Sequence, residues 1–116
     1  MVVAADPPAH QMAELERRGV VVLRAPSLSE ALLELRRRDI RSVLVEGGAR
    51  LAGAFVESAL VNRLIIFQAP LLLGADALNA FAFVPAAEPA GARRFAPVER
   101  RKLGADLMTI YAPRES

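Results

Sequence analysis

The sequence predicts an α/β fold: a three-layer sandwich with a mostly parallel sheet that ends in a C-terminal antiparallel hairpin. Up to residue 70, short apolar runs alternate with segments that are apolar at helical period. This alternation is typical of right-handed βαβ crossovers and a parallel sheet. Residues 94–112 are different, because two apolar stretches flank Gly104-Ala105-Asp106, which indicates a hairpin.

The first third of the chain contains two predicted strands and the helix between them. Residues 1–6, MVVAAD, predict a short buried strand. Residues 7–19 predict a helix that ends at Gly19, a residue that favours the left-handed conformation of a helix C-cap. Residues 20–26, VVVLRAP, are β-branched and continuous, so we expect a strand buried on both faces.

The next predicted helix, residues 27–39, has the clearest start signal in the chain. Ser27 and Glu30 have the spacing of a capping box, in which each side chain bonds to the backbone of the other residue. Four apolar residues then recur at helical period and define a buried stripe. They are Leu28, Ala31, Leu32 and Leu35.

The remaining elements continue the alternation. Residues 41–48 predict another buried strand, residues 49–60 a helix, and residues 62–70 a strand with a turn-rich exit. Residues 85–92, PAAEPAGA, predict a loop because they are small and rich in proline. The helix at 49–60 is expected to face inward through four side chains. They are Leu51, Ala54, Phe55 and Leu60.

Composition limits the classes of function. The 116 residues fit a single domain, 1–116, and a hydrophobic content of 53% supports a packed core. No apolar run reaches the length of a membrane span, and the first residues do not resemble a signal peptide, so the cytoplasm is the expected compartment. A net charge of only +2 and 5% aromatic residues argue against a nucleic-acid partner.

Glu46-Gly47-Gly48 is the segment that most strongly suggests a binding site. It lies at the carboxyl end of a predicted strand, where open α/β sheets bind ligands, and it leads into a helix. Free N–H groups at a helix start suit a phosphate, and Arg50 could add a charge-assisted contact. Two interpretations remain open: a dinucleotide phosphate cradle, or a tight connection with a surface arginine.

The other polar residues point to no catalytic machinery. Glu46 could bind ligand hydroxyls or form an ion pair with Arg50 or Arg41. His10, the single histidine, is expected at the surface, because no second metal ligand or nucleophile lies near it in the sequence. No metal is therefore expected and no catalytic residue is assigned. A reaction carried by a bound cofactor fits this inventory better than hydrolysis.

Several of these motifs together resemble a known family. Glu46-Gly47-Gly48, Leu60-Val61, Pro70 and Leu72-Leu73-Gly74 occur in the order and at the spacing found in the reductase domain of bacterial riboflavin biosynthesis. The closing stretch KLGADLMTIYA is also similar to the last strand of that domain. At residues 62–63 the chain departs from the family, which commonly has Asp-Glu there. The resemblance implies a fold of the dihydrofolate-reductase type.

The resemblance also implies an activity. Family members use NADPH to reduce 5-amino-6-(5-phosphoribosylamino)uracil to its ribitylamino form by hydride transfer, without a metal. Glu46 would reach the ribose hydroxyls of the substrate or the nearby nicotinamide. Six residues would line the NADPH phosphates: Gly47, Gly48, Ala49, Arg50, Leu51 and Ala52.

The length of the chain limits how much of that activity we expect. Family domains are about twice as long, so this chain resembles a partial reductase domain, the second half. We therefore expect weak cofactor binding and no turnover by the chain alone. Related reductases also lead us to expect a homodimer joined through sheet edges or through residues 94–112. The alternative is a non-catalytic half-domain that binds nucleotide or assembles with a partner.

Overall fold

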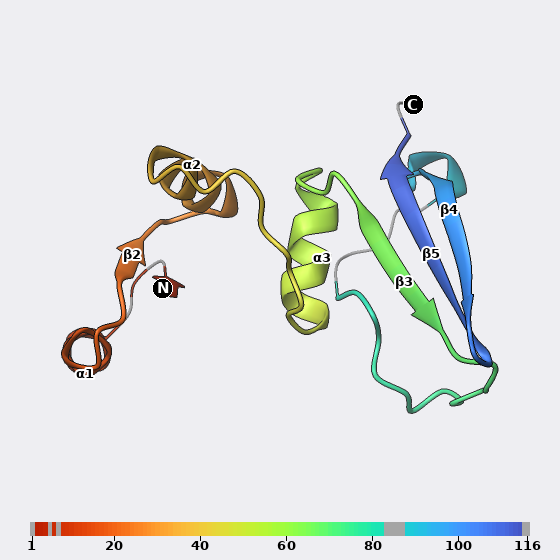
Figure 1. Cartoon of the computed structure of the whole chain (residues 1–116), viewed down its shortest axis with the longest axis horizontal. Coiled ribbons are helices and arrows are strands. Elements are labelled where there is room, and N and C mark those ends of the chain that lie inside the picture. The colour runs from red at the N-terminus through yellow and green to blue at the C-terminus, as the bar shows by residue number, and fades with distance from the viewer. Residues whose placement is uncertain (1, 5, 7, 83–87, 115–116) are drawn as a thin grey trace. The chain divides into compact units, whose positions relative to one another are not determined.

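A computed structural model describes residues 2–4, 6, 8–82 and 88–114 (Figure 1). The chain divides into two compact units, residues 1–44 and residues 45–116. Each unit contains its own small sheet.

The first unit has the alternating order that the sequence predicts. It contains β1 (Val2–Ala4), α1 (Ala9–Arg17), β2 (Val22–Arg24) and α2 (Leu28–Arg37). Strands β1 and β2 pair in parallel, with Val3 opposite Leu23, so α1 is a crossover helix. The predicted capping signal of α2 is confirmed in part, because the Ser27 hydroxyl accepts a hydrogen bond from the Glu30 amide at 3.2 Å.

The second unit is mainly antiparallel. It contains α3 (Ala49–Glu57), β3 (Leu64–Gln68), the 3₁₀ turn η1 (Pro89–Gly91), β4 (Phe95–Leu103) and β5 (Asp106–Pro113). The strand order is β3-β5-β4, and β5 pairs antiparallel with both neighbours. The expected hairpin is confirmed. A mostly parallel sheet is not confirmed, because among the described residues only β1 and β2 pair in parallel.

The hairpin between β4 and β5 has a two-residue turn and a bulge. Leu103 pairs with Asp106, and Gly104 has a φ of 62°, the positive value that type II′ turns require at their first central position. Further along β4, the register shifts between Pro97 and Glu99, which leaves Val98 as an extra residue. Pro97 is tolerated because β4 is an edge strand of this sheet.

The three described helices end in the same way. At α3, the Leu60 amide donates to the Phe55 carbonyl at 3.0 Å and the Ala59 amide to the Val56 carbonyl at 3.1 Å. These two bonds define a Schellman motif, which needs positive φ at the residue after the C-cap. The same residue position is held by Gly19 after α1 and by Asp39 after α2. The glycine cap expected at Gly19 is therefore confirmed.

One predicted strand does not form. Residues 41–48 have no strand pairing in the structure, and Leu44 is 75% exposed. A β-strand is stable only when its backbone N–H and C=O groups bond to a neighbour, and neither described sheet contributes one here. The apolar pattern was read correctly, but the prediction of a buried strand was wrong.

Two predictions of burial were also wrong. Leu23 in β2 is 4% exposed, but on the opposite face of the strand Val22 is only half-buried and Arg24 is exposed, so the strand is buried on one face only. Leu51 was expected to face inward from α3 and is 42% exposed. Few apolar residues of the described chain are buried, three in the first unit and one in the second. They are Leu23, Ala25, Ala31 and Val56.

The predicted loop at 85–92 is described only in part. Residues 85–87 lie outside the described residues. Pro89–Gly91 form η1, closed by a bond from the Gly91 amide to the Glu88 carbonyl at 3.0 Å.

The helix ends allow a stability test. Ala59 has a φ of 56°, a conformation that costs an L-residue about 1–2 kcal/mol. We expect Ala59→Gly to raise the free energy of unfolding by about 0.5–1 kcal/mol, since relief of strain exceeds the entropy cost of glycine. Ala54→Gly, inside α3, is the control and should lower it by about 1 kcal/mol. Urea unfolding measures the free energy of unfolding of both variants. An equal loss of stability in the two variants would contradict the proposal that Ala59 is strained.

Candidate functional site

The Glu46-Gly47-Gly48 segment leads directly into α3, as the sequence predicts. Glu46, Gly47 and Gly48 are exposed, and Gly48 is the N-cap residue of the helix. The six residues proposed for the phosphate contacts therefore run from Gly47, the residue before the N-cap, through the first turn of one helix. The fold brings them together by simple contiguity.

The N-terminus of α3 has no protein cap. Its N-cap residue, Gly48, provides no side-chain hydrogen bond to the first amides, and its first turn has no acidic residue. In α2, by contrast, Ser27 caps the helix and Glu30 stands in the first turn. Uncapped amides and the partial positive charge of a helix start are the features that bind anions. The start of α1 also has no side-chain cap and no acidic residue in its first turn, but its N-cap is Pro8, whereas that of α3 is Gly48.

The two glycines at this start have different surroundings. A Cβ atom on Gly47 would lie 2.6 Å from Cδ2 of Leu51, so a side chain there would displace the leucine. A Cβ on Gly48 would meet nothing within 4 Å, and the φ of Gly48 is −70°, which any residue adopts. Neither packing nor backbone conformation explains Gly48. The space in front of Gly48 is open.

A third glycine of α3 has a contact that sequence reasoning missed. A Cβ on Gly53 would lie 2.5 Å from the Ala82 carbonyl oxygen and 2.8 Å from its carbon. The Ala82 amide donates to the Ala49 carbonyl at 2.9 Å, so residue 82 runs along the first turns of the helix. Glycine inside a helix costs stability, and that was the available signal of a close backbone approach.

The charged residues at the junction do not pair with each other. Within the part of the chain that the structure describes, Glu46 and Arg50 form no ion pair, and both are exposed. Arg41 bonds instead to the Asp39 carboxylate at 3.0 Å. The alternative of a structural ion pair for Glu46 therefore finds no support, and its carboxylate is accessible to a ligand.

The remaining predicted positions contribute less. The Ala52 amide donates to the Gly48 carbonyl at 3.1 Å inside the helix, so this amide is already bonded. His10 is exposed on α1, as expected. No group of three metal-ligating side chains occurs among the residues described.

Comparison with known proteins assigns the family. Residues 1–108 match the family described as the RibD C-terminal domain. The chain belongs to this family. The resemblance drawn from the Glu-Gly-Gly and Leu-Leu-Gly motifs is thereby confirmed.

Two curated relatives are similar to the RibD-type chain over most of its length. The riboflavin biosynthesis protein RibD of Haemophilus influenzae is 34% identical over 87 residues, which are 75% of this chain and 23% of that protein. RibD of Escherichia coli K12 is 37% identical over 76 residues, 66% of this chain and 21% of that protein. The chain thus spans less than a quarter of the length of these two relatives.

A solved structure supports the fold. Acinetobacter baumannii RibD is similar at a TM-score of 0.80 and 29% identity, over 97% of this chain and 31% of that chain. The chain therefore has the fold of part of RibD. Among its described helices, none is both long and apolar enough to cross a membrane.

Substitution of Gly53 tests whether the backbone of residue 82 packs on α3. In an open helix, Gly→Ala stabilises by about 1 kcal/mol. Here the added Cβ meets the Ala82 backbone, so we expect Gly53→Ala to destabilise by about 1–3 kcal/mol and to lower the hydrogen-exchange protection of the Ala82 amide. Gly48→Ala, whose Cβ enters open space, should change stability by less than about 0.5 kcal/mol. A stabilised Gly53→Ala variant would show that residue 82 does not pack on α3.

Proposed function

We propose that this chain is the cofactor-binding part of an NADPH-dependent reductase of riboflavin biosynthesis, acting on 5-amino-6-(5-phosphoribosylamino)uracil. Membership of the RibD C-terminal domain family supports the pathway. The single observation that carries the binding role is Gly48: a glycine at an uncapped helix start that neither packing nor φ requires.

The residues of the junction fit an anionic cofactor. The first amides of α3 would donate to phosphate oxygens, and Gly48 leaves them accessible. The exposed Arg50 guanidinium would add a charge-assisted bond. The Glu46 carboxylate would accept from ribose hydroxyls or lie beside the nicotinamide. When bound, NADPH supplies the hydride; the protein residues named here bind and orient it.

A second role, that of a half-domain that assembles before it acts, is favoured by the exposed apolar surface. Phe67 in β3 is 66% exposed, and in the segment that follows, Leu72 is 101% and Leu78 98% exposed. Holding two reactants in one geometry contributes roughly 7–11 kcal/mol to lowering a reaction barrier. We propose that only the assembled protein holds both reactants in this way. We therefore expect no turnover by these 116 residues alone.

NADPH binding tests the proposed site. We expect Gly48→Asp to weaken NADPH binding at least tenfold, about 1.4 kcal/mol, because its carboxylate both fills the cradle and repels the phosphates. Ala105→Asp, which adds the same charge at the hairpin turn, should leave affinity unchanged. Titration calorimetry measures all three proteins. Equal heats from the parent and Gly48→Asp would show that the start of α3 does not bind NADPH.

We also propose that the chain on its own forms a homodimer, and that the edge of β3 takes part. The two edges of the sheet differ. Strand β4 carries Pro97, a bulge at Val98 and a run of charges at 99–102, features that discourage edge pairing. Strand β3, LIIFQ, has no such protection, and its Ile65 and Phe67 are exposed. An unprotected apolar edge favours pairing with another chain.

The oligomeric state can be measured directly. Light scattering coupled to gel filtration should give about twice the chain mass of 12.5 kDa at micromolar concentration. Ile65→Lys combined with Phe67→Lys should shift the protein to monomer, since charged side chains oppose edge pairing. Val98→Lys, on the protected edge, should leave the dimer intact. A parent protein of 12.5 kDa would refute the proposal.

A further inference from the structure

A pocket lies at the end of the second unit where α3 ends and β3 begins. It has a volume of about 350 Å³, within the roughly 300–1,000 Å³ range of small-molecule sites. Strands β3 and β4 begin at this end and β5 finishes here, so three strands and one helix terminus converge (Figure 1). It is a different place from the Gly48 start, because nine residues of α3 span about 13 Å.

The walls of the pocket are of two kinds. Val56 is buried, and Val61 and Phe95 are half-buried, so one part is apolar. The other part contains three arginines: Arg93, Arg94 and Arg114. None of the described residues that line the pocket has a carboxylate side chain. A site with an apolar part and a concentrated positive charge matches a ligand that has both an apolar group and an anionic group.

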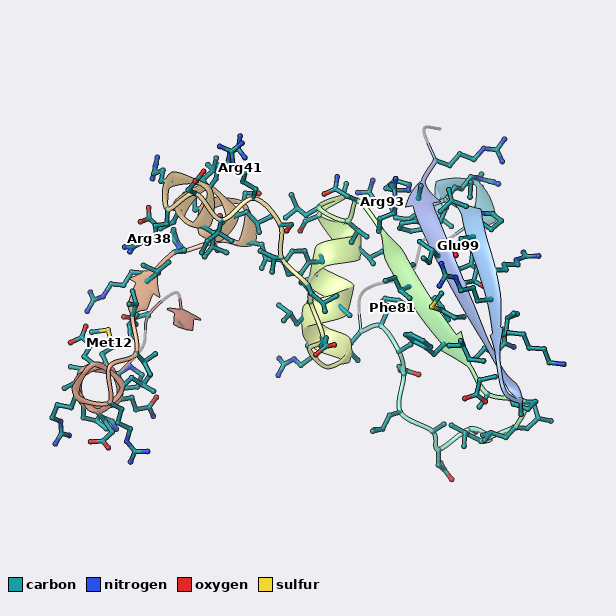
Figure 2. The ribbon with its side chains drawn as sticks, viewed as in Figure 1. Met12, Arg38, Arg41, Phe81, Arg93 and Glu99 are labelled. Carbon is teal, nitrogen blue, oxygen red and sulfur yellow. The ribbon has the colours of Figure 1, made fainter. Side chains whose placement is uncertain are left out.

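Backbone geometry fixes the three arginines beside one another. The Arg114 amide donates to the Arg94 carbonyl at 2.9 Å, which places these residues opposite each other at the open end of the hairpin. The Arg93 guanidinium donates to the Glu57 carbonyl at 2.7 Å, at the last turn of α3 (Figure 2). That bond neutralises part of the negative end of the helix, which would otherwise repel an anion.

The three pocket arginines are among those that form no ion pair with a carboxylate in the described chain. The ion pairs of the described chain all join an arginine to a carboxylate within four residues: Arg17 and Arg18 to Glu14, Arg37 and Arg38 to Glu34, Arg41 to Asp39, and Arg101 to Glu99. Arg93, Arg94 and Arg114 have no carboxylate partner among the described residues. Three like charges without a counter-ion repel one another, and a bound anion relieves that repulsion.

We propose that this pocket binds a small organic phosphate monoester, with the phosphate on Arg94 and Arg114 and the apolar group against Val61 and Phe95. A phosphate dianion suits several guanidinium groups better than a carboxylate does, because it has more charge and more acceptor oxygens. The site is separate from the proposed NADPH contacts and does not depend on them.

The probe is phenyl phosphate, and inorganic phosphate is the control that lacks the apolar group. Each is titrated into the full chain, and binding is measured from the NMR chemical shifts of the backbone amides. We expect saturable shifts that localise to residues 56–61, 90–95 and 113–114. Phenyl phosphate should bind at least fivefold more tightly than inorganic phosphate. Shifts confined to residues 46–52 would overturn the proposal. Equal affinity for the two probes would overturn the assignment of an organic ligand.

Matched double variants test the arginines. Arg94→Gln with Arg114→Gln should weaken phenyl phosphate binding at least tenfold, while the backbone bond between these residues remains. Arg36→Gln with Arg100→Gln removes the same charge from two exposed arginines outside the pocket and should leave affinity within twofold. Equal weakening in both, or in neither, would overturn the proposal. If the first variant fails to fold, Arg94→Lys with Arg114→Lys should weaken binding at least threefold, and unchanged affinity would overturn it.

Discussion

The backbone hydrogen bonding of β5 is the interaction on which the second unit depends. This strand pairs antiparallel with β3 from Leu64 to Gln68 and with β4 along nearly its whole length. Its Thr109 is the buried polar residue of the described chain. Because both ladders use β5, the start of β3 and the start of β4 come to the same end of the sheet. The arginine-lined pocket exists as a result of that convergence.

The helix α3 connects the two candidate sites of this unit. Its start is open to solvent through Gly48, and its end contributes Val56 and the Glu57 carbonyl to the pocket. Gly53 holds the backbone of residue 82 against its first turns. A helix of nine residues is too short to be stable by itself, so these tertiary contacts maintain it.

Local signals in the sequence predicted local structure well. Gly19 ended a helix, Ser27 capped one, and Gly104 turned a hairpin, because each acts on residues a few positions away. Apolar content alone did not determine which segments pair as β-strands. Residues 41–48 have the composition of a strand, but no neighbouring strand forms backbone hydrogen bonds with them. The exposure of Leu51, the contact of Gly53 with Ala82 and the grouping of Arg94 with Arg114 all depend on distant parts of the chain. The position of Glu46–Gly48 at the start of a helix was predictable because it depends on contiguous residues.

The strained end and uncapped start of α3 have a kinetic consequence. The hairpin β4–β5 closes across two residues and can form early from local contacts. The helix has Ala59 in an unfavourable conformation at one end and no cap at the other, so it gains its order only when residue 82 and Arg93 reach it from later in the chain. During synthesis, α3 would leave the ribosome well before the residues that stabilise it. The order of α3 therefore depends on residues up to Arg93, and an anion held at the helix start would favour the folded form by mass action.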